Sequence, residues 1–80
     1  MSIENKIRLA QLFDLYGALL SSGQRQAVKE WLDEDLTFSE IAENSGISRQ
    51  AVKDAVTKAE KKLEFYEDKL KFLNRLKGEE

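Results

Sequence analysis

This chain of 80 residues lacks cysteine, proline and histidine. Without cysteine no disulfide can form, and without either cysteine or histidine the usual ligands of zinc are missing. Nucleophilic catalysis of the Ser-His-Asp or Cys-His type is excluded, because the base that activates the nucleophile is absent. The carboxylates stand among Lys and Arg at helical spacing, which is typical of a solvated surface. We therefore expect no catalytic residue, no metal site and no cofactor, and we predict that the protein is not an enzyme.

Long hydrophobic runs are also missing. No apolar stretch approaches the length of a membrane span. Glu4, Lys6 and Arg8 interrupt the N-terminal segment where an export signal needs an apolar centre. We expect a cytoplasmic protein with no membrane contact.

Charge is low overall but unevenly distributed. The net charge is −2, yet residues 1–48 carry four basic and eight acidic side chains, while residues 49–77 carry nine basic and five acidic ones. The chain as a whole is therefore not a general polyanion binder. The segment that begins at Arg49 has the charge to face phosphates.

The hydrophobic periodicity predicts an all-α fold in one domain of residues 1–80, with four helices and no strand. A first packing helix is expected from about Ile3 to Leu20. A second helix follows Ser21, where Ser21-x-x-Gln24 has the spacing of a capping box. Trp31 on this helix is expected to be the large anchor of the core rather than a platform for a base.

Residues 37–52 have the form of a helix-turn-helix, within a predicted core of residues 22–58. Thr37-x-x-Glu40 is a second capping box. Gly46 is expected in the left-handed conformation of a tight turn, with Ile47 filling the turn and Ser48 capping the next helix.

The fourth helix is expected to be long, from Arg49 to about Lys77, with residues 59–77 extending the recognition helix. Its heptad-spaced seam contains Val52, Val56, Ala59, Leu63, Tyr66, Leu70 and Leu73. A second apolar strip lies beside the seam, so we expect a homodimer. Its predicted interface is Ile3, Ile7, Phe65, Phe72 and Leu76. The alternative is an intramolecular bundle in which the first helix alone covers the fourth.

Double-stranded DNA is the expected partner, because a helix-turn-helix presents its second helix to the major groove. Arg can bind guanine and Gln can bind adenine through paired hydrogen bonds, while Lys suits phosphates. The predicted nucleic-acid-binding residues are Arg25, Ser39, Ser48, Arg49, Gln50, Lys53, Thr57 and Lys58. The alternative is a packing module, since the same fold serves without nucleic acid and acidic residues lie near this face.

Several blocks of the chain resemble the YlxM-like family of bacterial proteins. They are Leu12-Phe13-x-x-Tyr16-x-x-Leu19-Leu20-Ser21, the acidic 33–35, Glu40-Ile41-Ala42-Glu43, Ser48-Arg49-Gln50-Ala51-Val52-Lys53-Asp54 and Glu60-Lys61-Lys62-Leu63-Glu64. Members of this family look like region 4 of sigma factors, which reads the promoter −35 element. The resemblance covers nearly the whole chain.

The resemblance implies a small, all-helical and dimeric protein with a regulatory or accessory role in the signal recognition particle pathway. Three hypotheses follow. The protein is a DNA-binding regulator, an accessory protein that binds signal recognition particle RNA or protein, or a structural adaptor without nucleic-acid binding.

Overall fold

The computed structural model describes residues 3–78, with side chains from Asn5 onward. This part of the chain contains five α-helices, one short 3-10 helix and no strand, so the expected all-α class is confirmed. The elements are α1 (Ile3–Tyr16), η1 (Gly17–Leu19), α2 (Ser22–Leu32), α3 (Phe38–Ser45), α4 (Arg49–Leu70) and α5 (Phe72–Leu76). Among the helices of residues 3–78, none is long and apolar enough to cross a bilayer.

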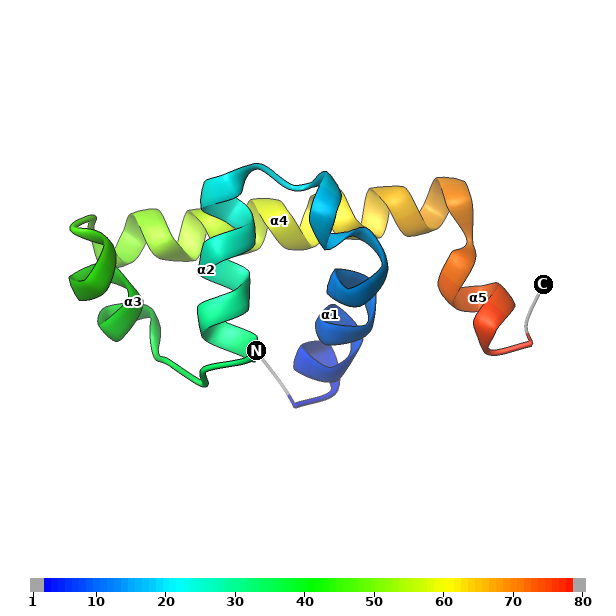
Figure 1. Cartoon of the computed structure of the whole chain (residues 1–80), viewed down its shortest axis with the longest axis horizontal. Helices are drawn as coiled ribbons and strands as arrows, with labels where there is room; N and C mark the ends of the chain where they lie inside the picture. The colour runs from blue at the N-terminus through cyan, green and yellow to red at the C-terminus, as the bar shows by residue number, and fades with distance from the viewer. Residues whose placement is uncertain (1–2, 79–80) are drawn as a thin grey trace.

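Helix α4 is the spine of the molecule, which measures 42 × 23 × 16 Å (Figure 1). Helix α3 packs at its N-terminal end, α2 and α1 lie across its middle, and α5 turns away at its C-terminal end. Helices α1, α2 and α3 all pack against α4, so α1 does not cover it alone.

The core consists of two buried clusters along this spine. The first joins α1, α2, α4 and α5, and contains Leu9, Leu12, Tyr16, Leu20, Val28, Ala59, Leu63 and Leu73. The second joins α2, α3 and α4, and contains Ala27, Ile41, Ala42, Val52 and Val56. Trp31 packs against both clusters, as predicted for a core anchor, but it is only partly buried.

The predicted helix starts are confirmed in detail. Both capping boxes form, at Ser21 with Gln24 and at Thr37 with Glu40. Each box satisfies two backbone N–H groups that have no partner within their helix. The local sequence therefore determines where α2 and α3 begin.

The long C-terminal helix is shorter than predicted. Helix α4 ends at Leu70 because Lys71 takes the left-handed conformation, with φ of 59°. The Glu67 carboxylate then accepts hydrogen bonds from the Leu73 and Asn74 amides, at 3.0 and 3.2 Å, and so caps α5. The break also changes which residues of the predicted apolar seam are buried. Leu73 is buried as predicted, but Leu70 is 38% exposed and Glu67 is buried instead.

Tyr16 of α1 holds this break in place. Its hydroxyl donates to Glu67 Oε1 at 2.7 Å and accepts from the Phe72 amide at 3.2 Å. Burial acts to raise the pKa of the Glu67 carboxyl, but the bonds from Tyr16 and the two amides, with the charge of Arg8, outweigh it and lower the pKa. Glu67 is therefore a buried carboxylate that is stable as the anion, and it ties α1, α4 and α5 together.

Candidate nucleic-acid interface

The helix-turn-helix consists of α3, a three-residue turn and α4. Gly46 takes φ of 70°, which a side chain disfavours, and its amide donates to the Ala42 carbonyl at 2.9 Å. The Ser48 hydroxyl accepts from the Ala51 amide at 3.0 Å and caps α4. Ile47 is 48% exposed, so its predicted role in filling the turn is wrong. The space between α3 and α4 is already occupied by the buried second cluster.

The outer face of α4 carries polar and charged side chains in two rows. Arg49, Lys53 and Thr57 are one helical turn apart, and Gln50, Asp54 and Lys58 form the neighbouring row. All six side chains are exposed. Within the described residues, the cations of this face make no ion pair. This face can therefore offer its positive charge to an external anion.

Gln50 and Asp54 form a local pair on this face. The Gln50 side-chain amide donates to Asp54 Oδ1 at 3.0 Å. The bond fixes which way the amide points, and both groups remain exposed. An adenine can replace Asp54 as the hydrogen-bond partner of the Gln50 amide, and a cytosine amino group can donate to the Asp54 carboxylate. The acidic side chain is thus compatible with base recognition, although it repels phosphate.

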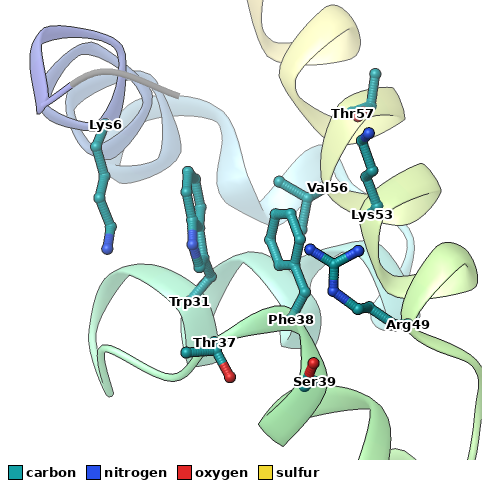
Figure 2. Close-up of a pocket in the computed structure, with 9 residues that line it drawn as sticks. All are labelled: Lys6, Trp31, Thr37, Phe38, Ser39, Arg49, Lys53, Val56 and Thr57. Atoms are coloured by element: carbon teal, nitrogen blue, oxygen red, sulfur yellow. The ribbon is translucent and has the colours of Figure 1, made fainter.

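A hollow of about 500 Å³ opens beside the first row of α4 (Figure 2). It is lined by Lys6, Trp31, Thr37, Phe38, Ser39, Arg49, Lys53, Val56 and Thr57. Four of the predicted nucleic-acid-binding residues meet here: Ser39, Arg49, Lys53 and Thr57. Ser39 reaches the hollow because the Thr37 cap places it in the first turn of α3.

The other four predicted residues lie outside the hollow. Gln50 and Lys58 belong to the second row of α4. Arg25 is exposed in the first turn of α2, and the Ser48 hydroxyl is engaged as the cap of α4. The predicted set therefore consists of a cluster at the hollow and separate residues around it.

Five lining residues were not in the predicted set, and they are Lys6, Trp31, Thr37, Phe38 and Val56. The Trp31 and Phe38 rings lie 5.6 Å apart between centroids, at an interplanar angle of 42°. Lys6 Nζ lies 4.8 Å from the Trp31 ring and 3.2 Å from Asp35 Oδ1. Lys6 comes from α1 and Trp31 from α2, so only the packing of the helices brings them to α4. The aromatic residue directly after the Thr37 cap was the one available local signal.

Two further acidic residues near this face, Asp35 and Glu40, are held by side-chain bonds. The Glu40 carboxylate accepts from the Thr37 amide at 2.9 Å, where the N-terminus of α3 offsets part of its charge. Asp35 pairs with Lys6.

Within residues 3–78, no group of His, Cys, Asp and Glu side chains is arranged to hold a metal ion.

Comparison with known proteins places these features in a family. Residues 3–80 match the model of the UPF0122 family, described as "Putative helix-turn-helix protein, YlxM / p13 like". The chain is 41% identical to a UPF0122 protein of Clostridium kluyveri over 95% of its own length and 68% of the relative's. It is 39% identical to one from Fusobacterium nucleatum, over 90% of this chain and 70% of the relative. It is 46% identical to one from Streptococcus agalactiae, over 88% of this chain and 64% of the relative.

Proposed function

This chain belongs to the YlxM/p13-like family UPF0122, and on that premise we propose that it is a DNA-binding regulatory protein that reads duplex DNA with the outer face of α4. The proposal makes it a binding protein rather than an enzyme, acting in the cytoplasm where bacterial DNA lies. A single observation carries it. Arg49 and Lys53 stand exposed one turn apart at the start of the second helix of a helix-turn-helix.

The roles of the residues follow from their chemistry. Arg49 and Gln50 lie in the first turn of α4, where a recognition helix contacts base edges. Each bidentate contact of this kind contributes about 1–3 kcal/mol of discrimination between bases. Lys53, Thr57 and Lys58 lie farther along and would contact the phosphate backbone, as would Arg25 at the start of α2.

A selection from random duplex DNA tests this function. It is done at about 50 mM salt, where the attraction to phosphates is little screened. We expect an enriched motif, and tighter binding to that duplex than to a double-stranded RNA of the same length. The RNA is a matched control, because its deep and narrow major groove does not admit a helix. Enrichment of no motif, or equal binding of the RNA, would contradict the proposal.

We further propose that the protein binds DNA as a homodimer, and an exposed aromatic patch supports this. The Phe65 ring lies 5.9 Å from Tyr66, Tyr66 lies 6.1 Å from Tyr16, and Tyr16 lies 6.0 Å from Phe72. Phe65 is 55% exposed and Phe72 43%. Leu76, one turn beyond Phe72 on α5, is 73% exposed. These three residues of the predicted interface are exposed, whereas the Tyr16 ring that links Tyr66 to Phe72 is itself buried.

The other two predicted interface residues do not join this patch. Ile7 is exposed but borders a different hollow, with Lys6, Ala10 and Leu32. It precedes Tyr16 by nine residues, or about 14 Å along α1. The Ile3 side chain lies outside the described part of the chain.

Sedimentation of two variants at micromolar concentration tests the dimer. Leu76→Asp places a charge in the patch, and we expect it to yield monomers. Ile7→Asp adds the same charge to a similarly exposed apolar residue elsewhere, and we expect it to remain dimeric. Wild-type protein that sediments as a 9.2 kDa monomer would rule the dimer out.

A further inference from the structure

The hollow beside α4 has two kinds of wall. Trp31, Phe38 and Val56 give it an apolar side, and Arg49 and Lys53 lie on one side of the two rings, with Lys6 on the other (Figure 2). Trp31 and Phe38 are only partly buried although both pack against the second cluster, so part of each ring remains accessible from the hollow. A DNA phosphate would use only the cations and would leave the accessible aromatic rings without a partner.

The combination selects a class of ligand. Aromatic side chains offer their faces to flat rings, and a base that stacks on such a ring gains about 1–3 kcal/mol. Cations attract phosphate, and a guanidinium can bind it through two parallel hydrogen bonds. The volume of about 500 Å³ lies within the range of small-molecule sites. A ligand that uses both walls is planar at one end and strongly anionic at the other.

We propose that this hollow binds a nucleoside phosphate, with the base against Trp31 and Phe38 and the phosphates against Arg49 and Lys53. Arg49 and Lys53 also belong to the proposed DNA-binding face. A bound nucleotide therefore occupies the cations that a duplex needs, and the two ligands compete. The competition rests on the proposed function, whereas nucleotide binding itself does not.

Isothermal titration calorimetry without DNA tests the site, using three probes. ATP carries both base and phosphates, tripolyphosphate carries only the charge, and adenosine carries only the base. We expect ATP to bind at least about tenfold tighter than either of the others, since one stacked base alone contributes about this factor. Emission from Trp31, which is the sole tryptophan of the chain, should change on adding ATP. Tripolyphosphate that binds as tightly as ATP would overturn the proposal.

Three variants locate the site. Phe38→Leu keeps most of the packing volume but removes the flat ring, and Lys53→Gln removes one cation from the rim. We expect each to weaken ATP binding about five- to tenfold, whereas Lys61→Gln, an exposed change on α4 outside the hollow, should leave it unchanged. Circular dichroism checks that each variant is folded. ATP binding that is the same in all three variants would place the ligand elsewhere and refute the site.

A competition measurement separates this proposal from the proposed function. Binding of ATP that displaces a selected duplex supports both. A protein that binds ATP but no duplex keeps the nucleotide site and loses the DNA-binding role. A protein that binds a duplex but not ATP keeps the DNA-binding role and loses the nucleotide site.

Discussion

The hydroxyl of Tyr16 is the contact whose removal gives the sharpest test of how the helices are held together. Tyr16→Phe deletes a single oxygen atom from a residue that is 1% exposed. That oxygen donates to the buried Glu67 carboxylate at 2.7 Å and accepts from the Phe72 amide at 3.2 Å. The phenylalanine ring keeps the apolar packing, so the change isolates the hydrogen bonds.

The expected cost is large for so small a change. A hydrogen bond to a charged group contributes about 1.5–3 kcal/mol, and the Phe72 amide loses its side-chain partner as well. We therefore expect the free energy of unfolding to fall by about 2–3 kcal/mol. For a domain of this size each 1 kcal/mol shifts Tm by about 4–8 °C, so the midpoint should fall by roughly 10 °C or more.

Urea and thermal unfolding, followed by circular dichroism at one fixed protein concentration, measure this loss. Tyr66→Phe is the control, because Tyr66 is only partly buried and its hydroxyl has no hydrogen-bond partner among the described residues. It should change the free energy of unfolding by no more than about 0.5 kcal/mol. A Tyr16→Phe protein as stable as this control would refute the role assigned to the Glu67 cap.

The pH dependence of the Tyr16→Phe effect gives a second check. Because the folded-state pKa of Glu67 lies below its ordinary value of 4.5, its stabilising contribution is present above that value and is lost as the pH falls through the folded pKa. Without the Tyr16 hydroxyl the folded-state pKa of Glu67 rises, because one of the hydrogen bonds that offset the effect of burial is lost. The difference in stability between wild type and Tyr16→Phe should therefore be largest near neutral pH and shrink as the pH falls through the folded-state pKa of Glu67. A difference that stays constant through this range would contradict the assignment.

Other consequences concern the helix-turn-helix and its ligands. Lys53→Gln should reduce the slope of log affinity for duplex DNA against log salt concentration by about 0.9, measured by fluorescence anisotropy, and an unchanged slope would remove Lys53 from the phosphate contacts. Gly46→Ala should destabilise the protein by about 1–2 kcal/mol in urea unfolding, because its cost comes from φ of 70° and a Cβ would meet no atom within 4 Å. A neutral result would show that the turn adopts another conformation.

Local chemistry explains the parts of the fold that the sequence predicted well. The Ser21 and Thr37 capping boxes, the left-handed Gly46 and the Ser48 cap each depend on residues within four positions of one another. Such features are readable from residue types and spacing alone. Together they define the start of α2, α3 and α4, and therefore the helix-turn-helix.

Long-range contacts explain what was missed. No glycine or proline marks the end of α4, where Lys71 adopts the left-handed conformation. The Glu67 cap at this break is anchored by a hydrogen bond from Tyr16, which lies 51 positions earlier in the chain. The hollow was missed for the same reason, since Lys6 and Trp31 reach α4 from two other helices. Arg49 and Lys53 were identified because they lie on the motif itself, whereas Trp31 was interpreted only as core and Phe38 was given no role.

The proposed base-reading role of Arg49 and Gln50 has one direct test. Arg49→Ala combined with Gln50→Ala is measured against the selected duplex and a scrambled duplex of the same length, across a range of salt concentrations. The account predicts that the double variant binds both duplexes equally and weakly, with affinity that still falls steeply as salt rises. If the double variant keeps the full preference for the selected duplex, the outer face of α4 does not read DNA.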